Sequence, residues 1–219
     1  MYKTKDLLDL SQTRAAALFE GRTYPWEALD DIKDFILELG PKLPRDEFDS
    51  PQEGVWIAKD ATVFSSAYIA PPCIIDHNAE VRHCAFIRGS AFVGRNCVVG
   101  NSVELKNVVL FDNVQVPHYN YVGDSVLGYK AHMGAGSITS NVKSDRSPVV
   151  VKNGGELIDT ERKKFGAILG DNVEIGCNSV LNPGSVIGRG STVYPVSCVR
   201  GVVPENSIYK DAEHIVKKQ

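Results

Sequence analysis

The chain has 219 residues, of which 43% are hydrophobic and 23% charged, and its formal net charge is −3. This length suffices for one large core, or for a small domain beside a larger one. The slightly acidic balance argues against a general binder of nucleic acids or anionic membranes, which would carry an excess of Lys and Arg. No apolar run reaches the roughly 18 residues of a membrane span, and no signal-peptide core is present. We therefore expect a cytoplasmic protein with no nucleic-acid or membrane partner.

The composition also indicates what kind of core to expect. Gly is frequent at 19 residues, whereas Met (2) and aromatic residues (8%) are scarce. This balance predicts a core of small and β-branched side chains. The 5 cysteines are an odd number without zinc-ligand spacing, which favours reduced thiols over disulfides.

Residues 1–50 are predicted to form a helical N-terminal region and linker. Ser11 can cap a helix that runs to Glu20, and Pro25 can open a second helix that ends at Gly40. Two helices cannot bury the apolar stripe of the second one by themselves, so we expect it to pack on the rest of the chain or on a partner. Residues 46–51 are predicted to be a linker. The stripe consists of Trp26, Leu29, Ile32, Phe35, Ile36 and Leu39.

An aliphatic residue recurs every six positions through most of the remaining sequence. A period of six fits neither an α-helix nor an alternating strand, and it is typical of a β-helix with three short strands per coil of about 18 residues. The sequence therefore predicts an all-β fold: a parallel β-helix of hexapeptide repeats over residues 51–208, with the helical region before it. Known β-helices of this class are left-handed, so a left-handed parallel β-helix is expected. A short C-terminal helix in residues 209–219 would cap the last coil. The repeat positions are Ile57, Val63, Ile69, Ile75, Val81, Ile87, Val93, Val99 and Leu105, with Phe111 and Pro117 in phase, and then Leu169, Ile175, Leu181, Ile187, Val193 and Val199.

The repeat breaks at two places, where function is expected. After Pro117 the next in-phase position is Gly123, and the pattern resumes at Leu127, two residues out of register. The second break, residues 142–165, contains a predicted hairpin with strands at 149–151 and 156–158 around an Asn-Gly-Gly turn. A basic stretch follows the hairpin.

Several residues at these breaks carry chemistry. An imidazole such as that of His118 suits general-base work at neutral pH, and the Glu104 carboxylate lies less than one coil away. Arg88 and Lys106 can contact an anion. Each of these residues is also compatible with a solvated surface role. The same holds for Lys163 and Lys164, which could meet a polyphosphate or keep a loop soluble, and for Tyr121 and Asn141, which border the breaks.

Three motifs in fixed order identify a known domain that the chain resembles. They are GNSVELK from residue 100, PHYNYVGD from residue 117 and MGAGSITSN from residue 133. The sequence from about 57 to 204 resembles the acetyltransferase domain of bifunctional N-acetylglucosamine-1-phosphate uridyltransferase/glucosamine-1-phosphate N-acetyltransferase. The resemblance implies a left-handed β-helix and a homotrimer that binds acetyl-CoA between subunits, with a small-molecule sugar phosphate as the second substrate.

The resemblance also implies roles for individual residues. His118 would be the general base and Glu104 its orienting carboxylate. The sugar phosphate would be bound by Arg88, Lys106 and Tyr121, with Asn141 bordering the pocket. Acetyl-CoA would lie along Ala135 and Cys177, and Lys163 and Lys164 are expected to bind its polyphosphate. Two positions depart from the family pattern: His132 replaces an Asn in the expected substrate pocket, where it is a candidate rival base, and Ser147 replaces a Lys, for which Arg146 is a candidate substitute.

The leading hypothesis is therefore direct acetyl transfer from acetyl-CoA to an amino-sugar phosphate, a reaction that requires no metal. A second hypothesis is a non-catalytic sugar-nucleotide-binding or scaffold trimer. A third is a metal-dependent enzyme of the carbonic-anhydrase type that uses His83, His118 and His132. The roughly 55 residues before the repeat contain no Gly-rich nucleotide loop, so we expect no uridyltransferase activity from this chain.

Overall fold

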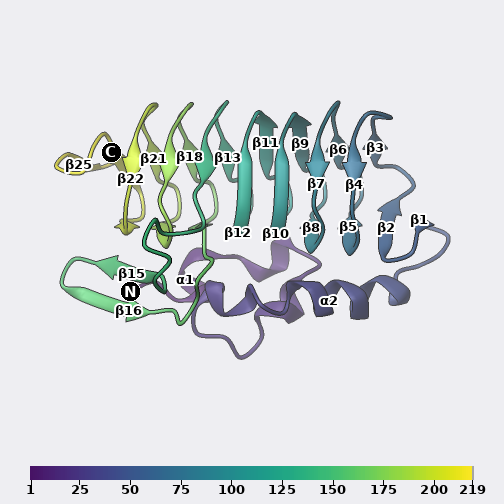
Figure 1. Ribbon diagram of the computed structural model, residues 1–219, viewed down its shortest axis with the longest axis horizontal. Coiled ribbons are helices and arrows are strands. Elements are labelled where there is room, and N and C mark those ends of the chain that lie inside the picture. The colour runs from purple at the N-terminus through teal and green to yellow at the C-terminus, as the bar shows by residue number, and fades with distance from the viewer. Residues whose placement is uncertain (219) are drawn as a thin grey trace.

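Each six-residue unit of the repeat forms one short strand and one corner, because the aliphatic side chain points inward and a residue with positive φ turns the backbone. The computed structural model describes residues 1–218, and its parallel β-solenoid has about nine turns (Figure 1). Equivalent strands of successive turns pair in parallel and form three faces. We number the faces in the order in which the chain visits them. The all-β solenoid predicted from the sequence is confirmed.

Face 1 comprises β2 (Val55–Ala58), β5 (Cys73–Ile75), β8 (Ala91–Val93), β17 (Ala167–Leu169), β20 (Ser185–Ile187) and β23 (Val202–Val203). Face 2 comprises β3 (Thr62–Val63), β6 (Glu80–Val81), β9 (Val98–Asn101), β11 (Gln115–His118), β13 (His132–Met133), β18 (Glu174–Ile175), β21 (Thr192–Val193) and β24 (Ser207–Tyr209). Face 3 comprises β4 (Tyr68–Ile69), β7 (Phe86–Ile87), β14 (Ile138–Thr139), β19 (Val180–Leu181) and β22 (Cys198–Val199). The long strands β10 (Glu104–Leu110) and β12 (Tyr121–Leu127) run from face 3 onto face 1.

Most strands contribute a stacked aliphatic side chain to the interior. On face 1 the inward residues of successive turns pair in register and are all 0% exposed: Ile75, Val93, Leu110, Leu127, Leu169 and Ile187. A narrow prism leaves no room for larger groups, which accounts for the scarcity of Met and aromatic residues.

The register between turns changes at the corners between faces 3 and 1. Ile87 pairs with Leu105, three full repeats later, whereas the pairs Leu105–Val122 and Val122–Thr139 are each a single position short of that spacing. Both shortened turns lose their residue just after the face 3 strand, which straightens β10 and β12 into continuous strands. The prediction that Phe111 and Pro117 are in-phase positions is therefore wrong. The inward places belong to the preceding residues, Leu110 and Val116.

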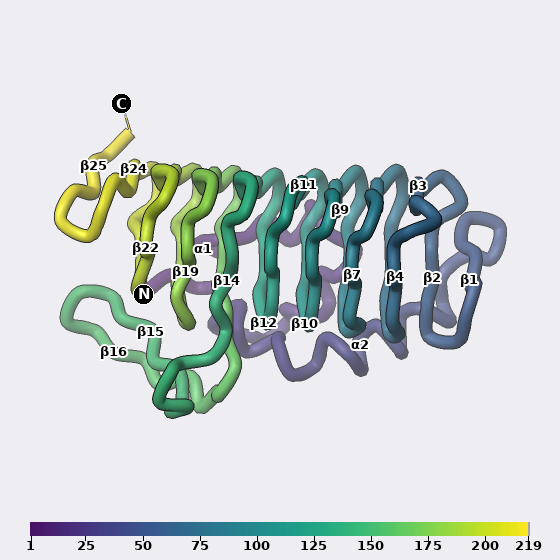
Figure 2. The backbone as a smooth tube through the Cα atoms, turned by 45° about the horizontal axis from the view of Figure 1, so that its top comes forward, coloured from purple at the N-terminus to yellow at the C-terminus, as the bar shows by residue number. Residues whose placement is uncertain are grey.

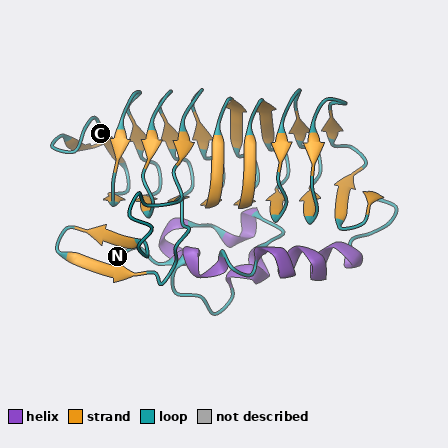
Figure 3. Cartoon of the chain, in the orientation of Figure 1, coloured by secondary structure: helices purple, strands orange, loops and turns teal. Residues whose placement is uncertain are grey.

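The N-terminal region packs along face 1, below the solenoid in Figure 3. Its apolar stripe is confirmed as a packing surface, since Trp26 is 2% and Ile36 0% exposed and the Trp26 ring lies against Phe165. The predicted helix from Ser11 to Glu20 is wrong, because this segment follows the solenoid surface in short turns. The helices are α1 (Thr4–Leu7), η1 (Leu10–Gln12), η2 (Ala16–Phe19), η3 (Pro25–Ala28), α2 (Ile32–Leu39) and η4 (Gly40–Lys42).

Both ends of the solenoid are covered by antiparallel strands. The predicted linker at 46–51 is instead β1 (Phe48–Gln52), which pairs with β2. The predicted C-terminal helix is also wrong: β25 (Ile215–Lys217) pairs with β24. In each case the added strand satisfies the open hydrogen-bonding edge of one strand of the terminal turn, β2 or β24.

The chain leaves the solenoid once, between β14 and β17. The predicted hairpin is confirmed as β15 (Val150–Asn153) and β16 (Glu156–Asp159), paired in antiparallel fashion. Figure 2 shows this hairpin beside the last turns, while the strands of face 3 lie in front with no other segment of residues 1–218 over them. Among residues 1–218, no helix is long and apolar enough to cross a membrane.

Candidate functional site

The candidate site comprises face 3 and the two corners that border it. His118, Ala135 and Cys177 occupy the corner between faces 2 and 3 in three successive turns. Gly136 N donates to His118 O at 3.0 Å, and Asn178 N donates to Ala135 O at 2.8 Å. Stacking of equivalent corners therefore brings the expected base and the expected acetyl-CoA contacts into one row.

The His118 imidazole is exposed at this corner, and its backbone is held by Asn120. Asn120 is 2% exposed, accepts from His118 N at 3.1 Å and donates from Nδ2 to Gly134 O at 2.8 Å. Among residues 1–218, no side-chain hydrogen bond involves the His118 ring. The corner thus presents an accessible imidazole on a fixed backbone.

The expected pairing of Glu104 with His118 is not present within this chain. Glu104 lies at the start of β10 on the outer surface of face 3, and its Oε1 accepts from Arg88 Nη1 at 2.7 Å. The solenoid explains this contact, because Arg88 lies one turn earlier and next to the same face. The bond to Glu104 raises the pKa of the Arg88 guanidinium, so Arg88 is a permanent cation beside face 3.

A cluster of polar side chains around Asp124 occupies the corner between faces 3 and 1. Lys106 Nζ is 3.1 Å from both carboxylate oxygens of Asp124, and Asn107 Nδ2 is 3.0 Å from Oδ1. Asn141 Nδ2 donates to Oδ2. The structure therefore brings two of the expected substrate-binding residues, Lys106 and Asn141, onto one carboxylate. Asp124 was not a candidate from the sequence, although it stands at the point where the register shifts.

Tyr121 lies between the two corners, at the start of β12. Its Cα is in register with that of Glu104, and its ring lies over Gly123, where an added Cβ would be 2.5 Å from the phenol oxygen. Burial is the main cause that raises the pKa of Tyr121, and the charges of Asp124 and Glu104 act in the same direction. Tyr121 is thus a neutral phenol at physiological pH and can donate a hydrogen bond.

His132 is separated from the other expected substrate-binding residues. It begins β13 on face 2, and its Nδ1 is 2.8 Å from Glu174 Oε2 on the next turn. Within one chain, faces 2 and 3 meet only along the edge of the solenoid on which His118 lies, and His132 lies away from this edge. The structure therefore does not bring His132 together with Arg88, Lys106 and Tyr121.

Lys163 and Lys164 line a cavity of about 250 Å³ beside Asp124. The preceding residue, Arg162, is held by an ion pair between its Nη1 and Asp30 Oδ1 in the N-terminal region. The two lysines are exposed. They lie at the corner between faces 3 and 1, whereas Ala135 and Cys177 lie across face 3. A role of these lysines in binding acetyl-CoA remains a prediction.

The histidines do not form a metal site within residues 1–218. The His83 ring packs against Phe64 with centroids 4.3 Å apart, and His132 is bonded to Glu174. In this part of the chain, no group of three or more His, Cys, Asp or Glu side chains is arranged to hold a metal ion.

Comparison with known proteins finds a matched region that includes His118, Glu104 and Asp124 but ends before Cys177. The family model described as the GMPPB C-terminal domain matches residues 69–175. The bifunctional protein GlmU of Methanococcus maripaludis is 35% identical over 116 residues, which are 52% of this chain and 28% of that protein. A bifunctional sugar-1-phosphate nucleotidylyltransferase/acetyltransferase of Sulfurisphaera tokodaii is 34% identical over 105 residues, 48% of this chain and 26% of that protein. The match thus spans little more than a quarter of these relatives.

Solved structures are matched at lower identity. A mutant of GDP-perosamine N-acetyl transferase from Caulobacter crescentus, in complex with CoA and GDP-perosamine, has a TM-score of 0.32 and 15% identity, covering 75% of this chain and 57% of that one. The acetyltransferase domain of PglB from Neisseria gonorrhoeae has a TM-score of 0.27 and 15% identity, covering 74% of this chain and 56% of that one.

The six-residue period and the parallel solenoid define this chain as a hexapeptide-repeat β-helix protein. More particularly, it is related to the C-terminal acetyltransferase domain of the GlmU type of bifunctional nucleotidyltransferase-acetyltransferases.

Proposed function

We propose that this chain is an acetyl-CoA-dependent N-acetyltransferase that acts on an amino-sugar phosphate resembling glucosamine-1-phosphate. The observation that carries the proposal is the arrangement across face 3. An exposed imidazole, His118, lies at one corner, and the cations Arg88 and Lys106 lie toward the other. An acceptor with its phosphate on the cations would extend its amine toward the imidazole.

The proposed reaction is a direct transfer. His118 removes a proton as the amine nitrogen attacks the thioester carbonyl, and the carbon–sulfur bond then breaks. The imidazolium returns the proton to the departing CoA sulfur. The backbone N–H of Ala135 has no hydrogen-bond partner among residues 1–218, and it is the proposed donor to the tetrahedral oxyanion. Binding both substrates on one fixed surface supplies the orientation that an acyl transfer requires.

We further propose that a second and a third copy of the chain cover face 3. Tyr68 is 62% and Phe86 43% exposed on this face, and Tyr119, next to His118, is 65% exposed. Exposed aromatic side chains in a row are a typical protein interface. In a homotrimer, the acetyl-CoA site would lie between such faces, and residues of face 2 such as His132 and Glu174 could reach a neighbouring site.

The proposed function is tested by CoA release. Purified protein is incubated with acetyl-CoA and a panel of amino sugars and amino-sugar phosphates, and the free thiol is measured with a colorimetric reagent. We expect turnover with at least one amino-sugar phosphate and less turnover with the unphosphorylated sugar. The absence of turnover on the whole panel would contradict the proposal.

A second candidate function, a non-catalytic sugar-nucleotide-binding scaffold, is favoured by one observation. The two positions that depart from the family pattern are engaged within the chain: His132 bonds to Glu174, and Ser147 Oγ donates to Asp145 Oδ1 at 2.8 Å. Tight binding of a sugar nucleotide without CoA release on any acceptor would support this alternative.

A further inference from the structure

We propose that Asp124 is a positioning residue for the acceptor: its buried carboxylate fixes the directions in which Lys106 and Asn141 face the substrate. This inference rests on the proposed function for the identity of the ligand. The contacts of Asp124 with Lys106 and Asn141 are observed in the structure.

The carboxylate of Asp124 is almost completely enclosed. Its side chain is 6% exposed, whereas that of Lys106 is 25% exposed. Three side chains contact it: Lys106 from β10, Asn107 from the same strand, and Asn141 from the start of the inserted loop. Asn107 also donates to Leu29 O at 3.0 Å, which ties the N-terminal region to the cluster. The side chains of Lys106, Asn107 and Asn141 thus all point to the Asp124 carboxylate.

The bonds to Asp124 determine what the partners offer to a ligand. Because Asn141 donates its Nδ2 to the carboxylate, its Oδ1 is left to accept a hydrogen bond from an amine or hydroxyl. Lys106 Nζ is 3.1 Å from both carboxylate oxygens, so the ion pair uses two of the three ammonium hydrogens and leaves one for an anion. The cluster therefore presents one acceptor and one cationic donor, a combination that suits an amino-sugar phosphate.

A purely structural role does not account for a carboxylate at this place. Asp124 has a φ of +47°, a conformation that Gly and Asn also adopt. The equivalent corners of other turns use small or amide residues, with Ser90 at +50°, Asn107 at +54° and Gly184 at +80°. None of these corners between faces 3 and 1, at 70–72, 88–90, 106–107, 182–184 and 200–201, contains an acidic residue. Apart from the corner enlarged by the inserted loop, the negative charge is thus confined to the turn that faces the candidate site.

The test uses Asp124→Asn, which keeps the shape and removes the charge, and Asp171→Asn as a matched control. Both parent residues are 4% exposed, and Asp171 forms an ion pair with Arg189 at the far corner between faces 1 and 2. Binding of glucosamine-1-phosphate is measured by calorimetry in the presence of CoA, which carries no acetyl group to transfer. We expect D124N to raise the acceptor Kd about tenfold and D171N to change it less than about twofold. The Kd for CoA should stay within about twofold in both variants.

Equal acceptor affinity in wild type and D124N, or equal weakening by D171N, would overturn the proposal. A parallel loss of CoA affinity in D124N would also overturn it, because a general structural effect would move both ligands. A crystal structure of D124N gives a readout that does not depend on activity. We expect Lys106 Nζ and the Asn141 amide to leave their wild-type positions, and unmoved side chains would refute the positioning role. If wild type binds no acceptor, the proposed function fails, while the crystal structure still decides the role of Asp124.

Discussion

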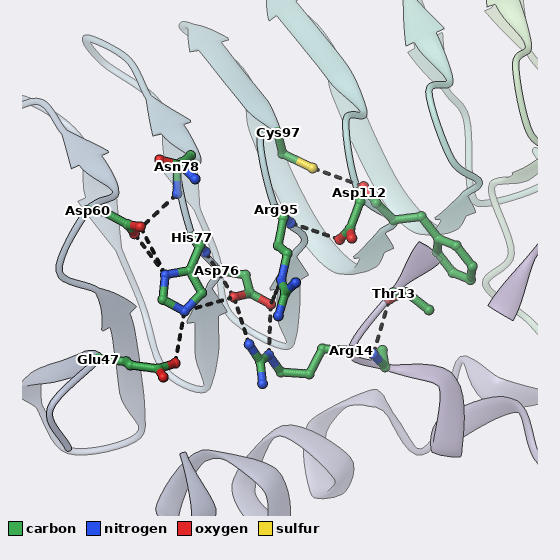
Figure 4. A network of polar contacts seen from close by, with 12 residues as sticks. Thr13, Arg14, Glu47, Asp60, Asp76, His77, Asn78, Arg95, Cys97 and Asp112 are labelled. Atoms are coloured by element: carbon green, nitrogen blue, oxygen red, sulfur yellow. Dashed lines mark hydrogen bonds and ion pairs between the residues drawn. The ribbon is translucent and has the colours of Figure 1, made fainter. Parts of the chain in front are cut away.

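Arg14 and Asp76 form an ion pair that fastens the N-terminal region to the solenoid. Arg14 Nε is 2.9 Å from Asp76 Oδ2, and the Asp76 side chain is 0% exposed (Figure 4). His77 beside it contacts Asp60 and Glu47 at 3.0 and 3.1 Å, so the contact is part of a larger polar network. The bond to Asp76 raises the pKa of Arg14, which stays charged at any physiological pH.

Removal of Arg14 is expected to destabilise the fold. Arg14→Met leaves a fully buried carboxylate with only the more distant Arg95, at 3.9 Å, and His77, at 4.0 Å, as ionisable partners among residues 1–218, and loss of one partner of a buried pair typically costs about 3 kcal/mol. The free energy of unfolding is measured by urea denaturation. Lys42→Met is the control, since Lys42 and Glu38 are 65% and 74% exposed and such pairs contribute less than about 1 kcal/mol. Equal effects of the two variants would contradict the assignment.

The buried thiol of Cys73 is expected to make the fold less stable in alkali. Burial raises the pKa of Cys73 from 9.0 to about 12, so the folded state keeps a proton that the unfolded state loses above pH 9. The contribution is fully present below pH 9 and is lost as the pH rises, by about 1.4 kcal/mol per unit. The slope of unfolding free energy against pH should be shallower in Cys73→Ala than in wild type. The same change of slope in Cys84→Ala, which removes an exposed thiol, would contradict this prediction.

His118→Ala is expected to lower kcat for acetyl transfer by about 10²–10⁴-fold, the usual contribution of a general base. The control is His214→Ala, since His214 is an exposed imidazole paired with Asp211 near the C-terminus. CoA release is followed for both variants. Activity retained in His118→Ala but lost in His132→Ala would assign the base to His132 instead.

Arg88→Ala is expected to raise the KM for the sugar phosphate about tenfold, with a smaller effect on kcat, because it removes a phosphate contact beside face 3. Arg82→Ala is a close control: Arg82 pairs with Glu80 at 2.9 Å on face 2, much as Arg88 pairs with Glu104. Steady-state kinetics against the acceptor separate the two. The same KM in both variants would remove Arg88 from the site.

The Tyr68→Glu, Phe86→Glu double variant is expected to be monomeric, because two charges on face 3 would be buried against another copy. Molar mass is measured by light scattering after gel filtration. Leu157→Glu alters a side chain on the hairpin that is 66% exposed and should leave the assembly intact. A wild-type protein that is itself monomeric would refute the proposed assembly.

Part of the site was accessible from the sequence through the motifs that carry the family resemblance, which pointed to His118, Ala135 and Cys177. These residues are 17 and 42 positions apart rather than multiples of 18, so the repeat alone does not place them on the equivalent corners where the structure has them. Asp124 was not among the predicted site residues, although it lies close to the two-residue loss of register. The loss is shared by two successive turns, each a single position short, and sequence alone cannot distribute it between corners.

The sequence by itself determined the solenoid, the hairpin and the packing stripe of the N-terminal region. These follow from local periodicity and turn chemistry, which act over a few residues. Only the tertiary structure decided which charges meet: Glu104 contacts Arg88 rather than His118, and Lys106 contacts Asp124. It also decided that the last segment is a strand, because β25 completes an open edge whose hydrogen-bonding demand belongs to the solenoid as a whole. Such pairings depend on distances between turns, and those distances exist only after the turns have stacked.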